Sequence, residues 1–112
     1  MVEICCSPGS DRVFHFAGLH DVLPAQYLPL TQDGNEAAFF LDLFRQHGIL
    51  ISGNGQRQPD GDLEYPCCFD GIGFTMINDI YNNWVHFEVD KPSQRKLLAQ
   101  KLRTLILEAS NK

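Results

Sequence analysis

The 112-residue sequence has no apolar run that approaches the roughly 20 residues of a membrane-spanning helix. Its start, Met1 to Cys6, also lacks the basic residues and long apolar core of a signal peptide. Both absences favour a cytoplasmic protein without a membrane partner. Apolar residues make up 44% of the chain, close to the roughly 45–50% typical of globular domains. At this length they can form one core, so we expect a single globular domain spanning 1–112.

Lysine and arginine are scarce over most of the chain. Residues 1–90 carry 13 acidic residues against three arginines, which gives a net charge of −10. Residues 91–112 carry six Lys and Arg residues against Glu108 alone, which gives +5. Proteins that bind nucleic acid directly gain affinity by placing cations against phosphates. The overall charge of −5 therefore argues against direct nucleic-acid binding and favours a basic protein partner.

The four cysteines lack the spacing of a structural zinc site. They form two adjacent pairs, Cys5-Cys6 and Cys67-Cys68, whereas zinc sites usually place about two to four residues between paired ligands. Adjacent residues on a strand point to opposite faces, so neither pair can clamp one ion. We expect at least one cysteine of each pair to be a small buried apolar residue. A disulfide between the pairs would require their segments to lie on adjacent strands.

No catalytic motif stands out from the sequence. A cysteine hydrolase needs a thiolate beside an imidazole, and no spacing in the chain brings Cys67 or Cys68 to His15 or His86. We therefore expect a protein that is not an enzyme and that holds no metal and no cofactor. A small metal-binding protein or enzyme built on the cysteine and histidine residues is the alternative.

The first half of the chain predicts two strands and a helix. Residues 2–5 and 12–16 are short apolar stretches joined by a turn-forming segment, as in a pair of strands. Apolar residues then recur at helical spacing from Asp33, a candidate N-cap, to Gly48, which is suited to end a helix. Residues 49–51 predict a further short strand.

The second half predicts more strands and a final helix. Residues 52–61 are polar and rich in glycine and predict a surface loop or the tip of a long hairpin. Strands are expected at 63–65, 73–77 and 84–89, and Asp90 is the candidate N-cap of an amphipathic helix of about 17 residues. The sequence therefore predicts an α+β fold, with a four- to five-stranded, mainly antiparallel sheet and two main helices packed on it.

Acidic residues are densest between Asp60 and Asp90, a stretch without lysine or arginine that holds half of the twelve aromatic residues. Its last strand places Trp84 and Glu88 on one face and Phe87 on the other. Carboxylates steer a basic partner to a surface, and aromatic rings supply the desolvated centre that carries most of the binding energy. A merely solvated face, with the tryptophan covered by a helix, is the alternative. The residues predicted to bind the partner are Asp60, Asp62, Glu64, Tyr65, Asp70, Asp79, Tyr81, Trp84 and Glu88.

Two segments carry a resemblance to a known class of protein. Residues 69–74 (FDGIGF) and 84–89 (WVHFEV), in a small acidic α+β chain, resemble the glycine-punctuated, aromatic-rich sheets of bacterial immunity proteins. These neutralise polymorphic toxins, including those of contact-dependent growth inhibition. The resemblance covers about the C-terminal half in style, without a diagnostic motif. It implies that the chain binds a cognate toxin domain, often a basic nuclease, and blocks its active site with an acidic surface that mimics phosphates.

An adaptor subunit whose basic last helix docks on an acidic neighbour is a further alternative.

Overall fold

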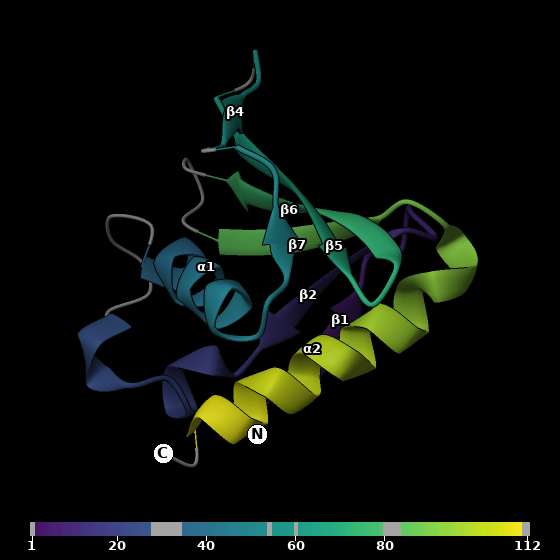
Figure 1. The fold of residues 1–112 in the computed structure, drawn as a ribbon. Coiled ribbons are helices and arrows are strands. Elements are labelled where there is room, and N and C mark those ends of the chain that lie inside the picture. Colours follow the sequence, from purple (N-terminus) through teal and green to yellow (C-terminus); the bar gives the residue numbers. More distant parts are fainter. Residues whose placement is uncertain (1, 28–34, 54, 60, 80–83, 111–112) are drawn as a thin grey trace.

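The computed structural model describes residues 2–27, 35–53, 55–59, 61–79 and 84–110, and these form an antiparallel sheet with two α-helices (Figure 1). The order of the sheet is β1-β2-β7-β6-β5-β3, with β4 beside β5. None of the described helices is long and apolar enough to cross a membrane. The strands are β1 (Glu3–Cys6), β2 (Val13–Ala17), β3 (Leu50–Ile51), β4 (Gln56–Arg57), β5 (Leu63–Phe69), β6 (Ile72–Asp79) and β7 (Trp84–Val89). The helices are α1 (Asn35–Gln46) and α2 (Arg95–Ser110), with the 3-10 turns η1 (Leu19–Asp21), η2 (Ala25–Tyr27) and η3 (Pro92–Gln94).

The predicted α+β class is confirmed, but the predicted count of four to five strands is too low, since the sheet has seven. β4 lies inside the polar stretch that predicted a surface loop or a long hairpin tip, and it forms because Gln56 and Arg57 pair with β5. β5 is longer than predicted and joins β6 through a tight turn at Asp70 and Gly71, whose φ angles of 51° and 79° are left-handed. β4 could not be predicted from the sequence, because a strand of two residues is too short to show an alternating pattern.

One face of the sheet forms the core. The pairing of strands places Phe14, Phe87, Met76 and Tyr65 side by side across β2, β7, β6 and β5, and all four are buried. α1 and α2 contact each other and pack on this face (Figure 1). The ring of Phe40 from α1 lies 5.0 Å from that of Phe87, centroid to centroid. The helices contribute the buried residues Ala37, Phe40, Leu43 and Phe44 from α1 and Leu98, Leu102, Leu105 and Ile106 from α2.

The helix ends agree only in part with the predicted signals. Gly48 follows α1 with a φ of 70°, as expected for a residue that ends a helix, and the candidate N-cap Asp33 lies outside the described residues. The prediction that Asp90 caps the final helix is wrong. Lys91 holds the N-cap position of η3, without a side-chain cap hydrogen bond, and η3 leads into α2. The Asp90 carboxylate lies instead against Gly73, where a Cβ atom would collide with it.

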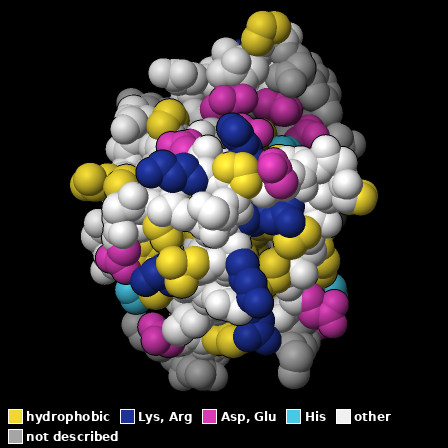
Figure 2. Space-filling model, turned by 90° about the vertical axis from the view of Figure 1, so that its right-hand side faces the viewer, with side chains coloured by type: hydrophobic (Ala, Val, Ile, Leu, Met, Phe, Trp, Pro, Cys, Tyr) yellow, Lys and Arg dark blue, Asp and Glu magenta, His cyan; other side chains and the backbone are white. Residues whose placement is uncertain are grey.

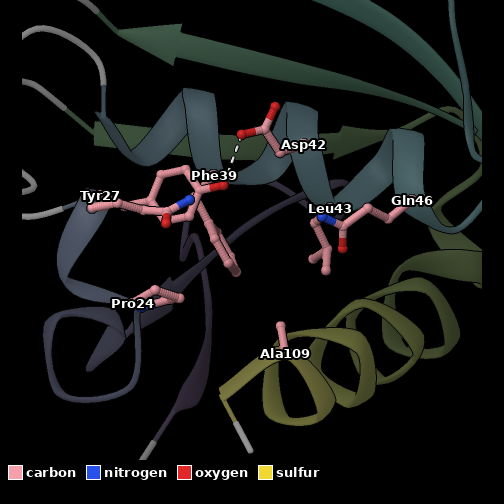
Figure 3. A pocket seen from close by; sticks show the side chains of 8 residues that line it. Pro24, Tyr27, Phe39, Asp42, Leu43, Gln46 and Ala109 are labelled. Carbon is pink, nitrogen blue, oxygen red and sulfur yellow. Dashed lines mark hydrogen bonds between the residues drawn. The ribbon is translucent and has the colours of Figure 1, made fainter. Parts of the chain in front are cut away.

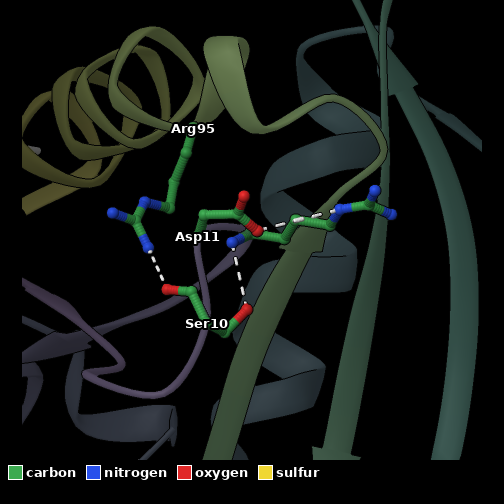
Figure 4. Close-up of polar contacts among 4 residues, drawn as sticks. Ser10, Asp11 and Arg95 are labelled. Carbon is green, nitrogen blue, oxygen red and sulfur yellow. Dashed lines mark hydrogen bonds and ion pairs between the residues drawn. The ribbon is translucent and has the colours of Figure 1, made fainter.

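The basic residues of α2 also hold the N-terminal hairpin in place. Arg95 Nη1 donates a hydrogen bond of 2.7 Å to the carbonyl oxygen of Ser10, in the turn between β1 and β2 (Figure 4). In the same turn the backbone N–H of Arg12 donates to Ser10 Oγ at 3.0 Å. Further along α2, Arg103 Nε donates to the carbonyl oxygen of Val2 at 2.9 Å. Two of the basic residues of the last helix, Arg95 and Arg103, therefore stabilise the fold.

Candidate functional site

On the face of the sheet opposite the helices lie the more polar side chains of each long strand. Side chains alternate along a strand, and burial alternates residue by residue in β2, β6 and β7. We call the outward side chains of β1, β2, β5, β6 and β7 the open face. No lysine or arginine occupies an outward position in these five strands as described. The charged or aromatic residues at outward positions are Glu3, His15, Glu64, Asp79, Trp84, His86 and Glu88.

Trp84 is the exposed aromatic residue of the open face. Its relative exposure is 37%, so no helix covers it. The indole Nε1 donates a hydrogen bond of 3.2 Å to Asp79 Oδ2, and the two residues are partners in the pairing of β6 with β7. This hydrogen bond satisfies the polar edge of the ring and leaves its apolar surface to contact a partner. Tryptophan in such a setting is typical of the residues that dominate protein interfaces.

Two histidines pack against the Trp84 ring. The ring centroid of His15 lies 4.8 Å away and that of His86 lies 5.2 Å away. Both Nδ1 atoms are buried without a hydrogen-bond partner among the described residues. Burial lowers the pKa of both imidazoles, although the negative charges of Asp62 and Asp79 act to raise that of His86. Burial therefore favours the neutral form of both rings.

Five of the predicted partner-binding residues are brought together on or beside the open face. Trp84, Glu88, Asp79 and Glu64 occupy outward positions on three adjacent strands. Asp62 lies just before β5 and acts electrostatically on His86. Of these carboxylates, that of Asp79 contacts the Trp84 indole, and those of Glu64 and Glu88 lie elsewhere on the same face.

The other four predicted residues are not placed on this surface. Tyr65 points into the core with a relative exposure of 8%, so the prediction that it could be an exposed anchor is wrong. The reason is its register: it pairs with buried Met76. Asp70 lies in the turn between β5 and β6, and its Oδ2 atom pairs with Lys101 Nζ of α2 at 3.0 Å. The candidates Asp60 and Tyr81 lie outside the described residues.

The open face contains residues that the sequence analysis did not select. His15 lies on it because Phe14 and Phe16 both point into the core. Glu3 joins it because β1 pairs with β2, where Glu3 faces Ala17. The alternation of residues 12–16 could have suggested the orientation of His15. Its contact with Trp84 depends on the pairing of β2 with β7, which joins distant segments of the chain.

No protein-family model, curated protein or solved structure matches this chain.

The cysteines form no pair. All four are free, and the strands that carry Cys5-Cys6 and Cys67-Cys68 are separated by β2, β7 and β6. The adjacent strands that a disulfide would require are therefore not formed. Cys67 is the buried cysteine of its pair, and burial raises the pKa of its thiol to about 12. A thiol in that environment is a poor nucleophile. The prediction of a buried cysteine is wrong for the first pair, because Cys5 is only partly buried and Cys6 is exposed. Within the described part of the chain, no three His, Cys, Asp or Glu residues are grouped to hold a metal ion.

A small pocket lies on the helical side, between η2, α1 and the end of α2 (Figure 3). Its volume is about 170 Å³, below the roughly 300–1,000 Å³ of typical small-molecule sites. Its most polar groups satisfy each other, because the Tyr27 hydroxyl donates a hydrogen bond of 2.7 Å to Asp42 Oδ2. Phe39 and Ala109 supply apolar walls. The pocket therefore offers little to select a small ligand.

Proposed function

We propose that the protein is a non-enzymatic inhibitor that binds a basic protein domain through the open face and blocks that domain's active site. The observation that supports this is the exposed ring of Trp84 on a face that also carries Asp79, Glu64 and Glu88, with no lysine or arginine at the described outward positions. Glu88, Asp79 and Glu64 would attract the lysines and arginines of the partner and speed their encounter. The ring would then supply the apolar centre of the complex.

The proposed partner is a cognate toxin domain in the cytoplasm, which makes the protein an immunity protein of the polymorphic-toxin type. A nuclease toxin needs a basic cleft for the phosphates of its substrate. The carboxylates of an acidic sheet face can occupy the same cleft and exclude the substrate. The small acidic α+β fold and the position of Trp84 support this role.

The test pairs the protein with the C-terminal domain of the protein encoded immediately beside it. We expect a stable complex, and we expect co-expression to restore the growth of cells that carry the toxin domain. Raising the salt from about 0.05 M to about 0.5 M should slow association about tenfold or more, because screening weakens steering. The absence of both a complex and growth rescue would overturn the proposal.

Matched variants locate the binding surface. Trp84→Ala should weaken binding about thirtyfold, the effect of a central aromatic anchor. Glu88→Lys should slow association strongly, since it places a cation on the open face. Glu108→Lys is the control, because Glu108 is exposed on α2, on the other side of the sheet. Equal binding of the Glu88→Lys and Glu108→Lys variants would show that the partner does not use the open face.

A further inference from the structure

β1 forms a free edge of the sheet. In the described part of the chain its only neighbour is β2. The backbone N–H of Ser7 donates to the carbonyl oxygen of Val13 at 3.1 Å, and bonded pairs alternate along an antiparallel ladder. In β1, the residues whose backbone N–H and C=O groups bond to β2 are therefore Cys5 and Glu3. The backbone N–H and C=O groups of Ile4 and Cys6 point away from β2, toward the edge.

α2 runs along this edge (Figure 1). Side chains of the two elements line a groove. Contacts at both ends hold the helix there: Arg103 Nε donates to the carbonyl oxygen of Val2, and Arg95 Nη1 donates to that of Ser10. The volume of the groove is about 360 Å³. Its lining residues are Ile4, Cys6, Arg95, Lys96, Ala99 and Gln100.

The groove is basic on its helical side. Arg95 and Lys96 line it, no acidic side chain among the described residues does, and Lys96 is exposed. Figure 2 shows lysine and arginine side chains gathered on this side of the molecule, with hydrophobic side chains between them. An extended segment laid beside β1 would point every second side chain toward α2. Carboxylates at those positions would meet the cations of the groove.

We propose that the free edge of β1 binds an extended acidic segment of a partner protein by strand addition beneath α2. Backbone hydrogen bonds to Ile4 and Cys6 would supply affinity, and carboxylates facing Lys96 would supply specificity. Charge complementarity selects this occupant over a second copy of the chain. The side chains that β1 itself turns toward the helices, Ile4 and Cys6, carry no carboxylate. This surface is distinct from the open face, and the proposal does not rest on the inhibitor function.

Two peptides of equal length test the proposal, one alternating Glu and Thr and the other alternating Lys and Thr. The Glu-Thr peptide should bind about tenfold or more tightly than the Lys-Thr peptide, because only the first complements the groove. Amide hydrogen exchange followed by NMR should slow at Ile4 and Cys6 on binding, since both N–H groups enter the new ladder. Exchange that slows at neither residue would overturn strand addition.

Two variants separate the backbone contribution from the charge contribution. Cys6→Pro removes an edge N–H without removing a hydrogen bond to β2, and it should weaken binding of the Glu-Thr peptide about fivefold or more relative to Cys6→Ser. Lys96→Glu should weaken binding of the Glu-Thr peptide about tenfold. The control is Arg57→Glu, which makes the same charge change in β4 and should leave this binding unchanged. Thermal unfolding checks that each variant folds.

Three further results would refute the proposal. If Cys6→Pro bound the Glu-Thr peptide as well as Cys6→Ser does, the peptide would contact the charges of α2 without pairing with the backbone of β1. Equal effects of Lys96→Glu and Arg57→Glu would mean that the groove is not the binding site. A dimer of the free protein that Cys6→Pro dissociates, seen by sedimentation, would assign the edge to a second copy of the chain.

Discussion

Glu36 is a buried carboxyl group whose ionisation should limit the stability of the protein. It lies in the first turn of α1 with a relative exposure of 8%. Burial raises its pKa to about 7, and a hydrogen bond from the backbone N–H of Val85 lowers it by less. The ordinary value is 4.5. Glu36→Gln keeps the shape of the side chain and removes the charge.

The magnitude follows from the two pKa values. Between pH 4.5 and about 7 the folded protein keeps a proton that the unfolded chain has lost. The free energy of unfolding should therefore fall as the pH rises through this range, by about 1.4 kcal/mol per pH unit and about 3 kcal/mol in total. This stabilisation is complete below pH 4.5 and lost above about 7. Glu36→Gln should accordingly be more stable than the wild type by about 3 kcal/mol near pH 8, with little difference near pH 4.

Urea unfolding followed by far-UV circular dichroism, repeated across this pH range, measures the difference. Burial of His15 and His86 lowers their pKa and changes stability in the opposite direction, but this contribution is common to both proteins and cancels. Glu108→Gln is the control, because Glu108 is exposed. The same pH dependence in Glu36→Gln and wild type would show that the carboxyl group keeps its ordinary pKa, contrary to this prediction.

Three further predictions test the packing. Gly55→Ala should destabilise the fold by about 1–3 kcal/mol, because φ is +90° and a Cβ atom would lie 2.8 Å from the Tyr65 ring; an unchanged urea midpoint would contradict this packing. Arg95→Ala should cost about 1–2 kcal/mol and speed amide exchange in the turn between β1 and β2, whereas Arg95→Lys should recover part of the loss. In the native protein at about pH 8, Cys67 should resist a thiol reagent that modifies exposed Cys6, and equal rates would contradict the burial of Cys67.

The strongest sequence predictions concerned local periodicity. The alternation in 84–89 correctly placed Phe87 in the core and Trp84 with Glu88 on the opposite face, because adjacent side chains of a strand point in opposite directions. The final helix is amphipathic, as predicted, and buries Leu98, Leu102, Leu105 and Ile106 on one side. In both cases the information lies within a few residues of the chain.

Tyr65 and Asp70 show where such reasoning fails. Both lie in the acidic, aromatic stretch, and composition gave no reason to separate them from Trp84 or Glu64. Tyr65 is buried because β5 pairs with β6 in a register that sets it beside Met76. The Asp70 carboxylate is paired with Lys101, which lies 31 positions away in the sequence. Partners at that separation leave no trace in a local pattern.

By itself the sequence determined the α+β class, the two faces of the last strand and the division of charge between residues 1–90 and the final helix. The tertiary structure decided which carboxylates share a surface, and it placed His15 against Trp84 by pairing β2 with β7. It also left β1 as a free edge under a basic helix. The physical reason is the same for each: strand order and register are set by contacts between distant segments, and these form only when the whole core packs.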